Sequence, residues 1–181
     1  QQPKLFIRLR NNSKKIPGLL QQHQVPFEYC MIPGNDQKDC LRIANSIAID
    51  QWLPEQDYVV QDWASQASIY ALLQHLPEAP AAVWDVCSGA GGKSILLKDK
   101  LPPFSLLATD IRESILHNLQ LRFRKYNLGR AGTLAVNSAD AAAVDGVMKD
   151  RTFDLVLCDV PCSGSGTWAR TPEQFHFFKE R

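Results

Sequence analysis

The sequence predicts an α/β fold in which a doubly wound, mainly parallel sheet follows a small α+β subdomain. Three observations indicate this. The 181 residues are 45% apolar and 22% charged, which is typical of a globular domain with a sizeable core. From residue 82 onward, short apolar strands alternate with segments of helical periodicity. Polar and glycine-rich segments follow the strands, at the ends where such sheets bind ligands.

Residues 1–60 are expected to form the small α+β subdomain. Ser13 is a candidate N-cap for a helix that ends near His23. Three stretches rich in apolar and aromatic residues are expected to be strands: 5–10, 27–32 and 41–49.

Residues 61–181 are expected to form the main domain. Its first helix is predicted from Asp62, because apolar residues recur at helical spacing: Ile69, Leu72, Leu73 and Leu76. Four strands are predicted at 81–87, 104–110, 133–138 and 153–159. Between them we expect a helix at 93–100, a long helix after Asp110 with Glu113 in a capping box, and a short helix or loop after Asp140.

The last of these strands, 153–159, is expected to have a free apolar edge, because only four strands are predicted in the main sheet. The chain also does not begin with Met. We therefore treat it as a possible fragment, C-terminally incomplete, and expect further strands beyond Arg181.

Composition argues against several classes of protein. No apolar run approaches the roughly 20 residues of a membrane span and the N-terminus has no signal-peptide pattern, so a cytoplasmic protein without a membrane partner is expected. The five cysteines form no CxxC pair, so no metal site is expected. The sequence leaves the oligomeric state open, with a monomer favoured.

Positive charge is uneven, although the net charge is only +1. Residues 1–20 contain five basic residues and no acid, Arg8 and Arg10 among them. Residues 112–130 contain five basic residues against Glu113 alone. Each stretch is either a solvated charged face or a path for RNA.

The segment after the strand at 81–87 is rich in glycine. Gly89, Gly91 and Gly92 let the backbone turn sharply and approach a ligand, and the next helix offers unpaired N–H groups. Asp110 ends the following strand, where a carboxylate can accept hydrogen bonds from both hydroxyls of a ribose. The sequence therefore predicts a cofactor that contains adenosine.

Three cofactors of this kind compete. GGKS at 91–94 resembles the end of a Walker A loop, but Cys87 stands where that loop needs its first glycine. NAD is disfavoured because Ser94 stands where its motif needs a third glycine or alanine. S-adenosylmethionine is preferred, and a P-loop-like nucleotide site stays open as an alternative.

Three segments resemble, in order, motifs of the Sun-type cytosine-C5 methyltransferases of tRNA and rRNA. QDWASQ at 61–66 resembles the QD-x-[AS]-S-Q helix, and DVCSGAGGK at 85–93 resembles the cofactor loop DLCAAPGGK. DVPCSGSGTWARTPE at 159–173 resembles DAPCSGTGxxRRxPD, the most specific of the three. The resemblance runs from about Gln61 to the end of the chain. Ala90 replaces the usual proline, which should loosen the turn.

The resemblance implies a Rossmann-like domain that binds S-adenosylmethionine and methylates cytosine in rRNA or tRNA, with residues 1–60 contacting the RNA. It implies that Asp110 holds the ribose, that Asp140 faces the adenine, and that Asp159 lies between cofactor and base. The methionine part of the cofactor would be wrapped by Cys87, Ser88, Gly89, Ala90, Gly91, Gly92 and Lys93.

Carbon 5 of cytosine is a poor nucleophile until a thiolate adds at carbon 6. Asp159 could then hydrogen-bond the base, with Lys93 tuning it. In the family, the attacking cysteine lies in a downstream Thr-Cys motif and the residue that matches Cys162 helps to release the product. This chain has no Thr-Cys dipeptide. Two alternatives stay open: that Cys162 is the nucleophile, and that the chain is a cofactor- and RNA-binding module without turnover.

Overall fold

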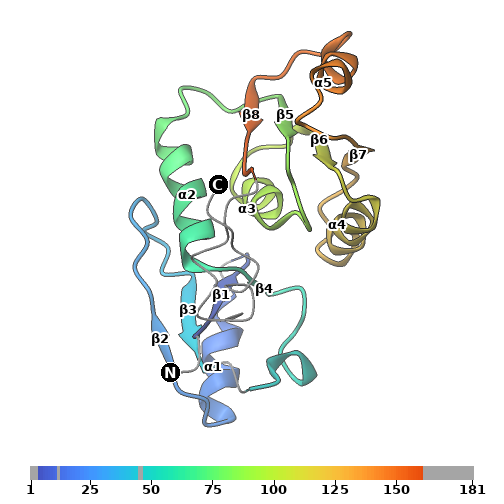
Figure 1. Cartoon of the computed structure of the whole chain (residues 1–181). Helices are drawn as coiled ribbons and strands as arrows, with labels where there is room; N and C mark the ends of the chain where they lie inside the picture. Colours follow the sequence, from blue (N-terminus) through green and yellow to red (C-terminus); the bar gives the residue numbers. More distant parts are fainter. Residues whose placement is uncertain (1–3, 12, 45–46, 161–181) are drawn as a thin grey trace, which may run out of the picture.

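The computed structural model describes residues 4–11, 13–44 and 47–160, and these residues form two four-stranded sheets (Figure 1). The N-terminal sheet is antiparallel, in the order β2-β3-β1-β4. Its strands are β1 (Leu5–Leu9), β2 (Phe27–Tyr29), β3 (Cys40–Ile43) and β4 (Tyr58–Val60). The second sheet is parallel, in the order β7-β6-β5-β8. Its strands are β5 (Ala82–Asp85), β6 (Ser105–Asp110), β7 (Gly132–Ala135) and β8 (Leu155–Leu157).

Helices alternate with the strands of the second sheet, which confirms the predicted doubly wound α/β fold. Within the described residues, the helices are α1 (Lys15–Gln22), the short 3₁₀ turn η1 (Ile49–Gln51), α2 (Trp63–His75), α3 (Gly92–Lys100), α4 (Glu113–Lys125) and α5 (Ala141–Met148). Figure 1 shows α2 running from the N-terminal sheet toward the parallel sheet.

Successive residues of a strand point to opposite faces of the sheet, and helices cover both faces of the parallel sheet. Val83 and Leu106 lie in a core cluster with residues of α2, α3 and α4. Their neighbours Trp84 and Leu107 lie in a separate cluster with Val147 of α5. The apolar run in β5 therefore serves two cores, as a buried parallel strand requires.

The same alternation in β1 gives that strand two different faces. Ile7 and Leu9 pack with α1 in a cluster confined to the N-terminal part of the chain. Arg8 and Arg10 point the other way, toward the main domain, and are 0% and 3% exposed. The prediction that these arginines form a solvated face or an RNA path is therefore wrong.

Buried ion pairs join the two parts of the chain. Asp99 of α3 accepts from Arg8 at 2.7 Å and from Arg10 at 2.7 Å. Lys100 contacts Asp39 at 2.9 Å, and the Tyr70 hydroxyl donates to the same carboxylate at 2.8 Å. The charged end of α3 is thus fastened to the N-terminal sheet.

Several local predictions were wrong. Lys14, rather than Ser13, occupies the N-cap of α1, and Arg112 without a side-chain cap precedes α4 in place of the predicted capping box. The strand expected at 41–49 ends at Ile43, and η1 follows it. The short strand β4 was not predicted. Asp62 does cap α2, accepting a hydrogen bond from the Ala64 N–H.

In the part of the chain that the structure describes, no helix combines the length and apolar character needed to cross a bilayer.

Candidate functional site

Three strand ends meet at one edge of the parallel sheet. β5 ends at Asp85, β6 ends at Asp110, and Asp159 follows β8. The strand order reverses at β5, because β6 and β7 lie on one side of it and β8 on the other. Ligands of doubly wound sheets bind outside the carboxyl ends of the strands at this reversal.

The loop between β5 and α3 turns through two glycines in the left-handed region. Gly89 has a φ of 53° and Gly91, the residue that precedes α3, has a φ of 78°. A Cβ atom on Gly91 would lie 2.9 Å from Leu119 Cγ, so both backbone conformation and packing require glycine here. Nothing described lies within 4 Å of a Cβ built on Gly89, so its surroundings leave room for a ligand.

Two neighbours hold this loop in place. The Ser88 N–H donates to the Thr109 carbonyl of β6 at 2.9 Å. Arg122 of α4 donates from Nη1 to the Ala90 carbonyl at 2.7 Å. Arg122 thus restrains the position at which alanine replaces the family's proline, a role that the sequence did not reveal.

Asp110 faces the loop from the end of β6. Its Oδ2 accepts from the Gly89 N–H at 3.1 Å, and its Oδ1 accepts from the Arg112 N–H at 2.9 Å. The Arg112 side chain also donates to both oxygens, at 3.0 and 3.2 Å. Burial alone would raise the pKa of Asp110, but these hydrogen bonds outweigh burial and lower it. The carboxylate predicted to hold a ribose is therefore ionised and already bound to Arg112, a neighbour that sequence reasoning missed.

Asp85 is a further site residue that sequence reasoning missed. It is 1% exposed, and its Oδ2 accepts from the Ser94 hydroxyl at 2.5 Å. Its Oδ1 and the Ser88 hydroxyl are buried without a hydrogen-bond partner among the described residues. Burial raises the pKa of Asp85 to about 6, and the charges of Asp159 and Asp110 add to that effect. The available signal was its position as the first residue of the DVCSGAGGK segment.

Lys93 and Asp159 form an ion pair between the start of α3 and the end of β8. The Lys93 side chain is 15% exposed and that of Asp159 is 56% exposed. Gln61 links the start of α3 to β1, because its Nε2 donates to the Gly92 carbonyl at 3.2 Å while its Oε1 accepts from Arg8 at 3.3 Å. Lys93 and Asp159, the two residues expected to act on the base, are therefore in contact.

The remaining predicted residues lie farther along the edge. The Cys87 thiol lies 3.4 Å from the Ser138 hydroxyl, in the segment after β7. Asp140 is the N-cap of α5, and its Oδ1 accepts from the Ala142 and Ala143 N–H groups at 3.0 and 3.3 Å. That its carboxylate faces an adenine stays a prediction. Cys162 lies outside the described residues.

Comparisons with known proteins show which family the chain resembles. The family model of the 16S rRNA methyltransferase RsmB/F matches residues 72–177, more than half of the chain. Ribosomal RNA small subunit methyltransferase B of Pectobacterium atrosepticum is 30% identical over 180 residues, which cover 96% of this chain and 39% of that protein. The chain therefore spans about two fifths of the length of such relatives.

Solved structures show the same fold at low identity. The structure of PH0851 matches with a TM-score of 0.79 at 19% identity, covering 99% of this chain and 40% of that chain. A methyltransferase homolog protein from Pyrococcus horikoshii matches with a TM-score of 0.67 at 19% identity, covering 98% and 56%. Taken with the family match, the order of the motifs and the meeting of three strand ends lead to one conclusion: this chain belongs to the RsmB/F family of 16S rRNA methyltransferases.

Proposed function

We propose that this chain forms the cofactor-binding part of an S-adenosylmethionine-dependent methyltransferase that makes 5-methylcytosine in RNA. The observation that supports this best is the convergence of Asp110, the glycine loop and the Lys93–Asp159 pair at one sheet edge. Family membership supports methylation of rRNA, since the relatives are named for that substrate.

The residues at this edge fit the proposed cofactor. Asp110 has the acceptor oxygens that two ribose hydroxyls need, and the left-handed glycines let the backbone approach the methionine part. The Oδ1 of Asp85, which has no hydrogen-bond partner in the described part of the chain, is a buried acceptor that suits an ammonium group. S-adenosylmethionine would supply a methyl group on a positively charged sulfur, and the nearby carboxylates of Asp85, Asp110 and Asp159 complement that charge.

Asp159 is suited to hold the target base. It lies at the reversal of strand order and its side chain is half-exposed, so a base could reach it from solvent. Its carboxyl group would hydrogen-bond the edge of cytosine that carries the ring nitrogen and the amino group. Lys93 would hold that carboxyl group in position through the ion pair.

The reaction also needs a thiolate. Its sulfur would add to carbon 6 of cytosine, and carbon 5 would take the methyl group, whose bond to the sulfonium sulfur breaks to leave S-adenosylhomocysteine. Loss of the carbon 5 proton to a base would then break the bond between carbon 6 and the cysteine sulfur. Cys162 would release the product, with a separate cysteine as the nucleophile, or would itself attack. Substituting Cys162 by serine distinguishes these roles, because a releasing residue leaves a stable RNA–protein adduct whereas a nucleophile leaves none.

Calorimetric titration tests the cofactor first. The chain should bind S-adenosylhomocysteine and not ATP with magnesium, and Asp110→Asn should weaken that binding about ten-fold or more, because a hydrogen-bonded charge is lost. Asp150→Asn, at an exposed aspartate that follows α5, is the matched control and should bind normally. Binding of ATP alone would support a P-loop-like site instead.

Tritium release tests the reaction. The protein at its full natural length should release tritium from RNA labelled at carbon 5 of cytosine, at the rate at which methyl groups enter the RNA. Methyl transfer without tritium release would place the methyl group on another atom. Cofactor and RNA binding without methyl transfer would indicate a binding module.

A further inference from the structure

The basic stretch at 112–130 divides into two groups in the structure. Three of its five basic residues contact other parts of the protein: Arg112 pairs with Asp110, Arg122 donates to the Ala90 carbonyl, and Lys125 pairs with Glu55. Among residues 4–11, 13–44 and 47–160, no carboxylate lies within ion-pair distance of the other two, Arg124 and Arg130. Both are exposed.

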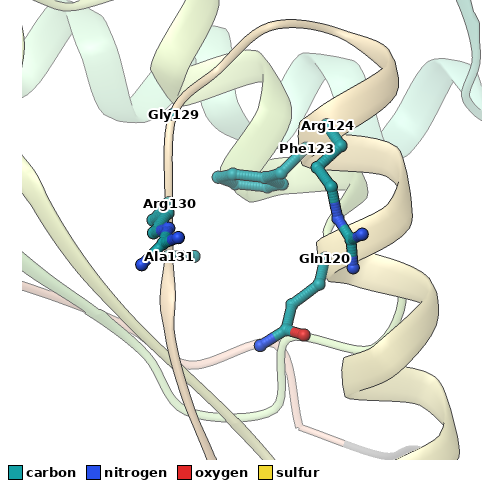
Figure 2. Close-up of a pocket in the computed structure, with 6 residues that line it drawn as sticks. All are labelled: Gln120, Phe123, Arg124, Gly129, Arg130 and Ala131. Atoms are coloured by element: carbon teal, nitrogen blue, oxygen red, sulfur yellow. The ribbon is translucent and has the colours of Figure 1, made fainter.

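These two arginines line one pocket. It lies between α4 and the segment that leads into β7, and its volume is about 440 Å³. Figure 2 shows Arg124 and Gln120 on the helix, Arg130 on the opposite segment, and the Phe123 ring between the two walls. The lining residues are Gln120, Phe123, Arg124, Gly129, Arg130 and Ala131, and none of them is acidic.

The end of α4 brings the two arginines together. The Leu128 N–H donates to the Phe123 carbonyl at 3.0 Å and the Asn127 N–H donates to the Arg124 carbonyl at 3.1 Å. Asn127 has a φ of 54°, so these bonds form a Schellman motif that reverses the chain. Gly129, with a φ of 76°, completes the turn and places Arg130 opposite the helix.

This turn also makes the helix end suitable for an anion. The carbonyls at a helix C-terminus normally repel negative charge. Here the carbonyls of Phe123 and Arg124 already accept hydrogen bonds from the turn. The Gln120 amide is fixed as well, since it donates to the Thr133 hydroxyl of β7 at 2.7 Å. The pocket therefore has fixed walls and two guanidinium groups that form no ion pair with any residue the structure describes.

We propose that this pocket binds the phosphate backbone of the RNA substrate. Guanidinium groups bind phosphates through paired hydrogen bonds. The pocket precedes β7 at one edge of the sheet, whereas Asp159 follows β8 at the other edge, so the two are separated by about 13 Å along the strands and by three strand spacings, about 14 Å, across the sheet. A structured RNA can therefore contact both, and the pocket would hold RNA that flanks the target cytosine. This inference rests on the proposed function, which identifies RNA as the ligand.

The test measures RNA affinity across a range of salt concentrations. A fluorescein-labelled RNA stem–loop is titrated by anisotropy with the full-length protein and with the variant Arg124→Gln/Arg130→Gln. Glutamine retains much of the side-chain length while removing the charge. The variant should bind more weakly, and the slope of log K against log salt should fall by roughly 1.4, because two phosphate contacts are lost at about 0.7 each.

The matched control is Lys149→Gln/Arg151→Gln, which removes the same charge from the exposed segment after α5. It should keep the slope of the unmodified protein, and both variants should retain their affinity for S-adenosylhomocysteine. Equal slopes for the two variants, or no RNA binding by the unmodified protein, would overturn the proposal. Failure of tritium release with normal RNA binding would instead count against the proposed reaction.

Discussion

Two aspartates with little-exposed side chains, Asp99 of α3 and Asp85 of β5, have very different surroundings. Asp99, near the end of α3, is 5% exposed at its side chain, and guanidinium groups from Arg8 and Arg10 contact both of its oxygens. Asp85, at the end of β5, is 1% exposed, and among the described residues its carboxylate accepts a hydrogen bond from the Ser94 hydroxyl alone, which leaves one oxygen without a partner. The comparison teaches that the protein compensates the charge of Asp99 with two guanidinium groups, whereas among the described residues it leaves one oxygen of Asp85 without a hydrogen-bond partner.

Asp99→Ala should have the largest effect on stability. The substitution leaves the buried guanidinium groups of Arg8 and Arg10 without their carboxylate, which costs about 3–5 kcal/mol. Urea denaturation measures the loss. As a control, Glu28→Gln breaks the exposed Arg42–Glu28 pair and should cost less than about 1 kcal/mol. Equal losses in the two variants would contradict the view that the contact between the N-terminal sheet and α3 depends on the ion pairs of Asp99.

Asp85→Asn should stabilise the protein in a pH-dependent way. Burial raises the pKa of Asp85 to about 6 from the ordinary 3.8, so the charged carboxylate is less stable in the folded state than in the unfolded state. The stability associated with neutral Asp85 is fully present below pH 3.8 and is lost as the pH rises through about 6. Asparagine stays neutral and avoids this loss.

Above about pH 7, the free energy of unfolding of Asp85→Asn should therefore exceed that of the unmodified protein by up to about 3 kcal/mol. Below about pH 3.8, where Asp85 is protonated in both the folded and the unfolded protein, the stability of the variant and that of the unmodified protein should change with pH in the same way. Urea denaturation at a series of pH values measures the difference. A difference that does not change with pH would show that Asp85 has a partner in solution that compensates its charge.

Arg112→Ala should have the smallest effect, and on binding rather than on folding. Arg112 is exposed but its side chain donates to both oxygens of Asp110, so ribose hydroxyls must compete with it. Removing the side chain should tighten S-adenosylhomocysteine binding by roughly two- to five-fold, as expected for an exposed ion pair. Added salt should reduce this difference.

Calorimetry on Arg112→Ala beside Lys149→Ala, an exposed lysine after α5, measures that effect. The lysine variant should bind like the unmodified protein. Weaker binding by Arg112→Ala would mean that Arg112 contacts the cofactor instead of competing with it.

The sequence predicted the parallel α/β fold well because its patterns are local. The apolar run at β5, the helical spacing of Leu116, Leu119 and Phe123 in α4, and the glycines before α3 each follow from neighbouring residues. The gathering of Asp110 and Asp159 at one edge also followed, since parallel strands end on the same side. Short and capping features were less predictable: the three-residue strand β4 is recognised only through its pairing with β1.

The charged residues show where sequence patterns stop. Arg8 and Arg10 resemble surface residues in the sequence, and strand alternation correctly separates them from Ile7 and Leu9. It does not reveal that α3 would cover their face and supply Asp99. Likewise, nothing local distinguishes Arg124 and Arg130, which line a pocket, from Arg122, which holds the glycine loop.

By itself, the sequence determined the fold class, the order of the elements from α2 onward and the residue types at the strand ends, because backbone preference and apolar periodicity act over a few residues. Only the tertiary structure decided which charges are compensated. It placed Arg112 on Asp110, left one oxygen of Asp85 without a partner among the described residues, and set Lys93 against Asp159. The reason is physical: the state of a charged group depends on burial and on partners that are distant in the chain, and both exist only after folding.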